Sequence, residues 1–122
     1  MTKRIVILGS TGSIGRQALA VIRQFPERFV VAGLAAGRNW RLLAEQVKEF
    51  RPAVVSVESK KEAQELSACL SFGERPEIFY GEAGLKEIAC CPDAEVVLTA
   101  VPGILGLLPT VAAIRAGKNI AL

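Results

Sequence analysis

Glycine recurs at every third position of the sequence GSTGSIG, residues 9–15, and this spacing could bind a phosphate group. Phosphates bind at helix N-termini, where backbone N–H groups are free and the helix dipole is positive. The sequence therefore predicts a nucleotide-binding loop, the alternative being a glycine-rich turn that binds nothing. Three hydroxyl side chains could also bond phosphate oxygens: Ser10, Thr11 and Ser13.

Each glycine has its own expected role in such a loop. Gly9 permits the sharp turn at the end of a strand, since glycine adopts backbone angles that other residues avoid. Gly12 lacks a Cβ atom, so a pyrophosphate can approach the backbone. Gly15 lets the following helix lie close to the sheet.

Strands and helices alternate along the chain and would position this loop. The expected strands are 4–8, 29–35, 53–57, 77–80, 95–99 and a last one that begins at 119. The expected helices are 13–24, 40–50, 60–71, 84–90 and 105–116, with Ser59 as the cap of the third. Such alternation predicts an α/β, Rossmann-like, doubly wound parallel sheet in three α/β/α layers. Strand 4–8 should lie centrally beside strand 95–99, so that the loops after both meet at one crevice.

The helical spacing also predicts which side chains reach the core. In the first helix these are Ile14, Ala18, Val21, Ile22 and Phe25. In the second they are Leu42, Leu43, Ala44, Val47 and Phe50. In the third, Leu66 and Leu70 are the best candidates.

The loop after the second strand bears on which dinucleotide is bound. NAD sites usually carry an acidic residue about 20 positions beyond the glycines, where it accepts from the ribose 2′-hydroxyl. Residues 34–39 contain no acid, but they contain Gly37, Arg38 and Asn39. Arginine forms paired hydrogen bonds with phosphate, and a 2′-phosphate distinguishes NADP from NAD. We expect NADPH to bind more tightly than NADH; the alternative is an ordinary exposed arginine.

Composition excludes several other functions. Histidine is absent from the 122 residues, which removes histidine triads and histidine metal ligands from this chain. The net charge of +3 is spread along the sequence, so no nucleic-acid surface is indicated. Residues 96–114 are uncharged, but prolines and glycines interrupt them, which argues against a membrane span. No signal peptide is evident.

No catalytic or metal-ligating set is predicted. Most carboxylates fall in segments away from the expected crevice, and the three cysteines, Cys69, Cys90 and Cys91, suit neither a disulfide framework nor a zinc site. Cys90, Cys91 and Lys118 should lie at the amino ends of strands, far from the nicotinamide. Since a cofactor domain needs a second domain to act on a substrate, we expect residues 1–122 to be a truncated NADPH-binding domain.

Three stretches together resemble one family. They are ILGSTGSIG at 7–15, AGRN at 36–39 and LPTVAAIRAGK at 108–118, and the resemblance to 1-deoxy-D-xylulose 5-phosphate reductoisomerases covers essentially the whole chain. It implies cofactor contacts at Thr11, Gly12, Ser13, Ile14, Gly37, Arg38 and Asn39. Members of the family often have lysine in place of Arg38.

The resemblance also implies an activity. Enzymes of this family rearrange 1-deoxy-D-xylulose 5-phosphate and reduce the product with NADPH to 2-C-methyl-D-erythritol 4-phosphate, in non-mevalonate isoprenoid biosynthesis. They use Mg²⁺, Mn²⁺ or Co²⁺, form cytoplasmic homodimers and are inhibited by fosmidomycin. The metal ligands lie beyond Leu122, so residues 1–122 alone should be inactive. Two alternatives are the cofactor domain of another NADP-dependent reductase, of the aspartate-semialdehyde or extended short-chain type, and a non-catalytic nucleotide-binding module.

Overall fold

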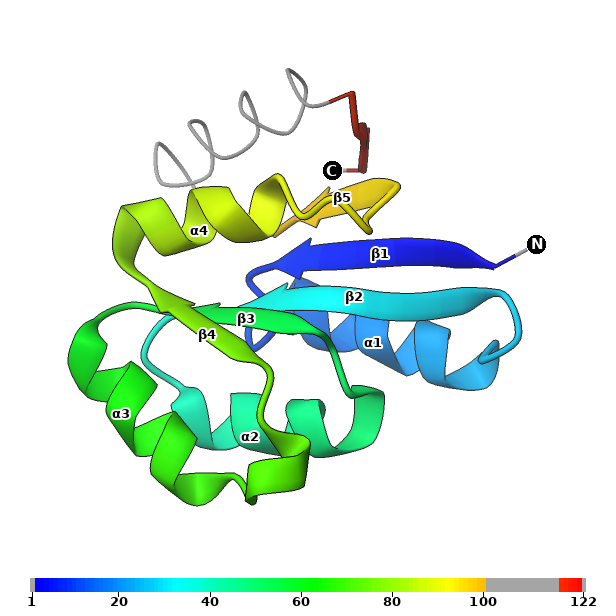
Figure 1. Ribbon diagram of the computed structural model, residues 1–122. Helices are drawn as coiled ribbons and strands as arrows, with labels where there is room; N and C mark the ends of the chain where they lie inside the picture. The colour runs from blue at the N-terminus through cyan, green and yellow to red at the C-terminus, as the bar shows by residue number, and fades with distance from the viewer. Residues whose placement is uncertain (1, 101–116, 122) are drawn as a thin grey trace.

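The computed structural model describes residues 2–100 and 117–121. In these residues a parallel six-stranded sheet has the order β4-β3-β2-β1-β5-β6 (Figure 1). The strands are β1 (Lys3–Leu8), β2 (Phe29–Ala35), β3 (Val54–Val57), β4 (Glu77–Tyr80), β5 (Val96–Thr99) and β6 (Asn119–Ala121). β1 is central and pairs with β5, as the sequence predicts.

The helices form layers on both faces of the sheet. They are α1 (Ser13–Gln24), α2 (Trp40–Phe50), α3 (Lys60–Cys69) and α4 (Gly81–Ala89), with a short 3₁₀ turn at Phe72–Glu74. Figure 1 shows α1, α2 and α3 below the sheet and α4 above it. The predicted α/β fold with three layers is therefore confirmed.

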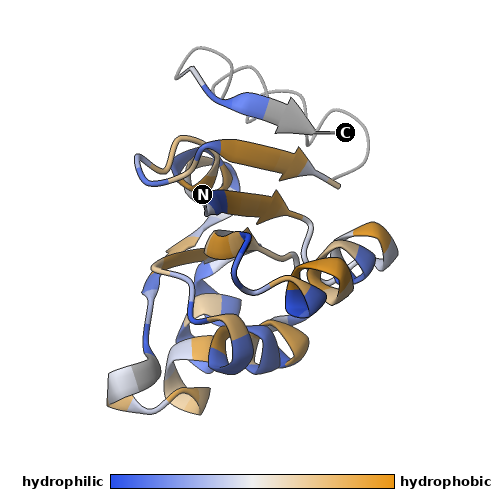
Figure 2. Ribbon diagram, turned by 90° about the vertical axis from the view of Figure 1, so that its right-hand side faces the viewer, coloured by the Kyte–Doolittle hydropathy of each residue, from blue (hydrophilic) through white to orange (hydrophobic). Residues whose placement is uncertain are grey.

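Each face of the sheet carries its own apolar core. Successive side chains of a strand point to opposite faces. In β1, Ile7 joins the core under α1, α2 and α3, whereas Val6 and Leu8 join the core under α4. In Figure 2 the central strands are apolar along much of their length, while the helices mix polar and apolar residues. Strands buried on both faces are typical of parallel sheets.

One irregularity in β2 lets α4 approach the sheet closely. The pairing of β1 with β2 shifts by one residue, because Ile5 pairs with Val31 but Val6 pairs with Gly33. A Cβ atom on Gly33 would lie 3.0 Å from a side-chain carbon of Val54 and 3.4 Å from one of Ile88 in α4. A side chain at this position would therefore force neighbouring side chains to move by a few tenths of an ångström, so a glycine suits the bulge.

The predicted buried face of α1 is partly wrong: Ile22 is buried as predicted, but Ile14, Val21 and Phe25 are not. The buried residues are Gly15, Leu19 and Ile22, whereas Ile14 and Val21 are 60% and 53% exposed. Of the other predicted residues, Ala18 is partly buried and Phe25 is exposed. The helix turns its glycine toward the loop that precedes it, and this contact fixes the face that meets the sheet. The apolar residues predicted for α2, by contrast, are buried or partly buried, as are Leu66 and Leu70.

Three helix boundaries also differ from prediction. Helix α3 ends at Cys69 rather than Ser71, and α4 runs from Gly81 to Ala89 rather than from Gly84 to Cys90. Gly81 has a φ of +73°, so β4 turns directly into α4 without a separate loop. Ser59 occupies the N-cap position of α3, but its hydroxyl bonds the Glu62 carboxylate instead of a backbone N–H group.

The predicted helix 105–116 lies outside the described residues, as does most of the uncharged stretch 96–114. Within the part of the chain that the structure describes, no helix is long and apolar enough to cross a membrane.

Candidate functional site

The glycine loop begins with a sharp turn that the sheet itself holds. Gly9 has a φ of +91°, in the region that favours glycine. The N–H groups of Gly9 and Ser10 both donate to the carbonyl of Ala35, at 2.8 and 2.9 Å. The end of β1 is thereby tied to the end of β2, so that the loops following these two strands leave the sheet side by side.

A glycine is required at position 15 because helix α1 lies in close contact with the start of the loop. A Cβ atom there would lie 2.1 Å from the Gly9 carbonyl oxygen and 2.7 Å from the Cα atom of Ser10. The prediction that Gly15 permits close packing is right, but the surface approached is the loop at the end of β1 rather than the face of the sheet.

The N-terminus of α1 is open toward solvent. Its N-cap, Gly12, makes no side-chain capping bond, and the first turn contains no acidic residue. Gly12, Ser13 and Ile14 are exposed, and Thr11 is partly exposed. A Cβ atom on Gly12 would meet only the Gly9 carbonyl oxygen, at 3.7 Å. Free N–H groups and an unneutralised dipole make this end suited to an anion.

Ser10 does not contribute a hydroxyl to this open surface. Its side chain is completely buried, and its Oγ atom has no hydrogen-bond partner among the described residues. The expectation that Ser10 could bond a phosphate oxygen is therefore wrong, because α1 and α2 cover it. Thr11 and Ser13 keep their accessible hydroxyls.

A pocket of about 220 Å³ lies beside the loop, at the carboxyl ends of the strands. The residues that line it come from four segments: Gly9 after β1; Ala35, Ala36 and Gly37 at β2; Ser56, Val57 and Glu58 at β3; and Gly81, Glu82 and Leu85 of α4. Carboxyl ends of parallel strands are where open α/β sheets bind ligands. The pocket is largely apolar and adjoins the loop, as a site for an adenosine next to a phosphate requires.

Arg38 follows Gly37 of the pocket lining and is paired with Glu58, which also lines the pocket. Its Nε atom donates to Glu58 at 2.5 Å, and the two side chains are 84% and 50% exposed. This hydrogen bond, and then the charge of Glu58, raise the pKa of the Arg38 guanidinium above its ordinary value. Sequence reasoning missed Glu58, which follows β3 and approaches Arg38 only because β2 and β3 are neighbours.

Asn39 has a structural role. Its side-chain oxygen accepts from the N–H group of Leu42 at 3.2 Å and so caps α2. Its amide nitrogen is a separate donor. Gly37 is exposed, and its backbone carbonyl accepts from the N–H group of Glu58.

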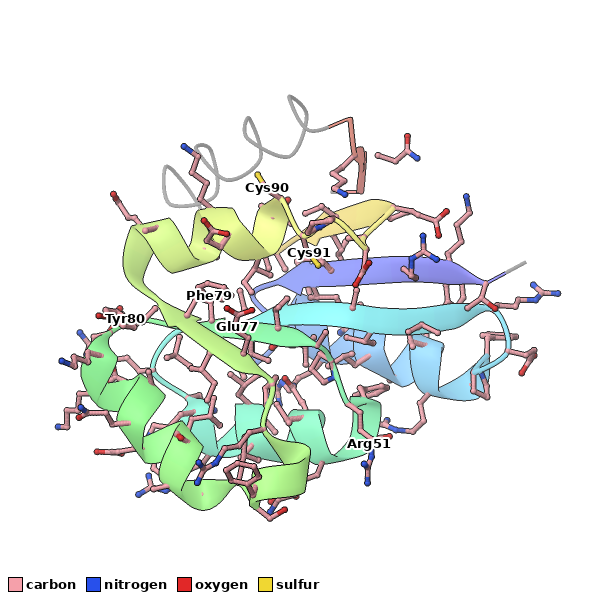
Figure 3. The ribbon with its side chains drawn as sticks, viewed as in Figure 1. Arg51, Glu77, Phe79, Tyr80, Cys90 and Cys91 are labelled. Carbon is pink, nitrogen blue, oxygen red and sulfur yellow. The ribbon has the colours of Figure 1, made fainter. Side chains whose placement is uncertain are left out.

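The residues predicted to lie far from the crevice do so. Cys90 and Cys91 follow the last residue of α4, and Figure 3 shows them at the opposite end of that helix from Tyr80, which ends β4. Cys91 is buried in the apolar core under α4. Lys118 donates to the carbonyl of Ala94, just before β5 begins. However, Glu58 and Glu82 line the pocket, so not every carboxylate is remote.

A parallel α/β sheet with a glycine loop, an open helix N-terminus and a pocket at its carboxyl edge defines a Rossmann-like, dinucleotide-binding class of domain. Residues 5–122 match the family model of 1-deoxy-D-xylulose 5-phosphate reductoisomerase. The chain belongs to this family.

Similar proteins of that name occur in several bacteria. The relative from Pelotomaculum thermopropionicum is 48% identical over 98% of this chain, and that from Pelodictyon phaeoclathratiforme is 51% identical over 98%. The chain spans about 31% of the length of each of these relatives.

Solved structures of the family share the fold. A crystal structure of DOX-P reductoisomerase with magnesium superposes with a TM-score of 0.94 at 35% identity, covering 100% of this chain and 30% of that one. The Zymomonas mobilis reductoisomerase in complex with NADPH gives a TM-score of 0.92 at 33% identity, covering 100% and 32%. The resemblance stated from the sequence is confirmed, as is the fold class.

Proposed function

We propose that residues 1–122 are the NADPH-binding domain of a 1-deoxy-D-xylulose 5-phosphate reductoisomerase. The observation that carries this proposal is the meeting of the open α1 N-terminus, the pocket and Arg38 at one edge of the sheet. A family member crystallised with NADPH supports the choice of cofactor.

Different groups of the site bind different parts of the cofactor. Backbone N–H groups of Thr11, Ser13 and Ile14 receive the pyrophosphate at the α1 N-terminus. Gly12, whose own N–H group donates to the Gly9 carbonyl at 3.3 Å, leaves room for it. The pocket receives the adenosine. Arg38 binds the 2′-phosphate, because Glu58 occupies only Nε and arginine has four further N–H donors on its Nη atoms. Gly37 and Asn39 border the same phosphate.

NADPH supplies a hydride to the substrate when bound. The residues described here hold and orient its adenosine half and carry no proton transfer. Their contribution is position, since a cofactor fixed at its adenosine end restricts where its nicotinamide can reach.

The substrate and metal chemistry is assigned to the rest of the protein. We propose that the whole enzyme converts 1-deoxy-D-xylulose 5-phosphate to 2-C-methyl-D-erythritol 4-phosphate in the cytoplasm, as a homodimer that uses Mg²⁺, Mn²⁺ or Co²⁺. Within residues 2–100 and 117–121, no three cysteine or acidic side chains are grouped as metal ligands. A family structure that contains magnesium supports the metal requirement, and one with fosmidomycin and magnesium supports a small-molecule substrate site.

Calorimetric titration of the intact protein with NADPH and with NADH tests the cofactor assignment. NADPH should bind at least about 10-fold more tightly, the factor that about 1.4 kcal/mol of phosphate contact gives. In Arg38→Ala most of this preference should disappear, whereas Arg38→Lys, which keeps the charge, should retain part of it. Equal affinities of the wild type for both cofactors would contradict the proposal.

The reaction itself is tested by activity. The intact protein should oxidise NADPH in the presence of 1-deoxy-D-xylulose 5-phosphate and Mg²⁺, and residues 1–122 expressed alone should not. Oxidation by the isolated residues would contradict their assignment as a cofactor domain without catalytic groups.

A further inference from the structure

A buried amide links helix α2 to the glycine loop. Gln46 is 6% exposed, and its Nε2 atom donates to the backbone carbonyl of Ser10 at 2.9 Å. The two residues are 36 positions apart in sequence, so this bond joins two separate βα units. Ser10 is fully buried and directly precedes the residues proposed to receive the pyrophosphate.

The apolar packing around Gln46 does not explain why this position holds a polar amide. Its neighbours on the same face, Leu43, Ala44 and Val47, belong to the core under α1, α2 and α3. Among the described residues, neither Gln46 Oε1 nor Ser10 Oγ has a hydrogen-bond partner, although both atoms are buried. An unpartnered buried acceptor destabilises a fold, and a leucine or methionine at this position would not carry that cost. The bond to the loop therefore explains why the side chain is polar.

Two separate contacts hold the loop. Helix α1 approaches until a Cβ atom at Gly15 would overlap the Cα atom of Ser10. The bond from Gln46 fixes the direction of the Ser10 carbonyl. Because a peptide group is planar, fixing that carbonyl also fixes the N–H group of Thr11, which shares the same peptide unit.

The same helix begins at the second cofactor loop. Asn39 caps α2, and Arg38 immediately precedes it. Two turns further along α2, Gln46 reaches the first loop. Helix α2 thus sets the distance between the proposed sites of the 2′-phosphate and the pyrophosphate, the two ends of one ligand segment.

We propose that Gln46 is a positioning residue for the cofactor. Through Ser10 it orients the N–H group of Thr11 toward the pyrophosphate and, through α2, keeps that loop in register with Arg38. This inference rests on the proposed NADPH function and extends it to a residue that does not touch the cofactor.

Two substitutions in the intact protein test it. Gln46→Leu removes the donor and the unpartnered acceptor while retaining bulk, but it also leaves the buried Ser10 carbonyl without this hydrogen bond. The variant should therefore fold with a somewhat lower melting temperature. Its Kd for NADPH should rise by about 10-fold, as expected for one lost hydrogen bond. The value of kcat at saturating NADPH should change less than about 3-fold, because the reacting groups are untouched. The exposed neighbour Glu45→Gln is the matched control and should bind as the wild type does.

Gln46→Glu adds a readout that a merely structural role would not give. The introduced carboxyl can donate to the Ser10 carbonyl only when protonated, and burial raises the pKa of a carboxyl. The affinity of Gln46→Glu for NADPH, expressed relative to that of the wild type, should therefore recover as the pH falls by about two units, from 8 toward 6. This comparison uses the ratio of the two proteins at each pH, which cancels titration of the cofactor phosphate.

The outcomes are separable. If the wild type fails to bind NADPH, the proposed function fails. If the wild type binds and Gln46→Leu binds equally well, only the role of Gln46 is refuted. Where one variant does not fold, the other decides: unchanged affinity in Gln46→Leu, or a pH-independent ratio in Gln46→Glu, overturns the inference.

Discussion

The two edges of the sheet carry pockets of similar size but of different character. At the carboxyl edge, the pocket of about 220 Å³ is lined by Gly9 of the glycine loop, which leads into the N-terminus of α1, and by the first residues of α4. At the amino edge, a pocket of about 250 Å³ lies between the last turns of α1 and α2 and the start of β2. Helix N-termini offer free N–H groups, whereas C-termini offer carbonyls, so only the first edge suits an anion.

An arginine–glutamate pair stands at each edge. At the amino edge, Arg23 binds both carboxylate oxygens of Glu49 and stacks on the ring of Phe50 at 5.6 Å. At the carboxyl edge, Arg38 uses Nε alone toward Glu58. The first pair is bidentate, through Nε and Nη2 of Arg23, and joins two helices. The second engages Nε alone and leaves the Nη donors of Arg38 next to the pocket-lining residues Gly37 and Glu58. An arginine–glutamate pair therefore indicates a function only when its position and the remaining N–H donors of the arginine are known.

The largest expected effect is at the helix-to-loop contact of the carboxyl edge. Gly15→Ala places a Cβ atom 2.1 Å from the Gly9 carbonyl oxygen, so loop or helix must move. Overpacking of this kind costs about 3 kcal/mol, and NADPH binding should become undetectable. Thermal unfolding with and without NADPH measures both. Wild-type stability in the variant would show that the approach of α1 to the loop is not required.

Gly12→Ala should separate binding from folding. Its φ of −78° suits any residue, and the added Cβ atom would meet only an oxygen at 3.7 Å, so stability should be unchanged. Affinity for NADPH should fall at least about 10-fold, because the methyl group lies where the pyrophosphate approaches. Gly73→Ala, at another glycine with open space around it, is the control and should leave affinity unchanged. Normal binding by Gly12→Ala would remove the pyrophosphate from this position.

Glu58→Gln sharpens the comparison of the two ion pairs. Without the carboxylate, the guanidinium of Arg38 is fully available to the 2′-phosphate, and a repulsive charge is lost. We expect NADPH to bind about 3-fold more tightly, within the range of exposed pairs, and NADH to be unaffected. Glu82→Gln, which lines the same pocket, is the control. Weaker NADPH binding in Glu58→Gln would instead make Glu58 an orienting partner of Arg38.

The smallest effect is expected at the amino edge. The hydrogen bond from Arg23 lowers the pKa of Glu49 below its ordinary value. A carboxyl whose pKa is lowered by folding stabilises the fold above its unfolded pKa and loses this contribution as the pH falls through the folded pKa. Glu49→Gln should therefore lower the melting temperature by no more than about 2 °C at pH 7, and the difference should vanish in acid. NADPH affinity should not change. A change in affinity would contradict the separation of the two edges.

Local patterns predicted much of the secondary structure because they depend on neighbouring residues. Helix α2 was predicted with its observed ends, since Asn39 caps it and Pro52 follows Arg51, whose φ is +50°. The buried face of α1 was predicted only in part, because that face is set by the contact of Gly15 with a loop, which no helical periodicity contains.

The candidate site divides in the same way. The glycine loop and the position of Arg38 could be predicted, since each is a short motif with its own backbone requirement. Glu58 and Gln46 could not, because both reach the site across the fold, from the end of β3 and from α2. Gln46 in particular lies on an apolar helix face, where the sequence gives no sign that an amide has a specific partner.

By itself, the sequence determined the strand–glycine–helix unit, the alternation that requires a parallel sheet, and the resemblance to one reductoisomerase family. These follow from residue type, spacing and short-range steric rules. Only the tertiary structure decided that Ser10 is buried, that Arg38 faces a carboxylate, and that Gln46 holds the loop. Strand order brings these residues together, and strand order results from packing across the whole sheet.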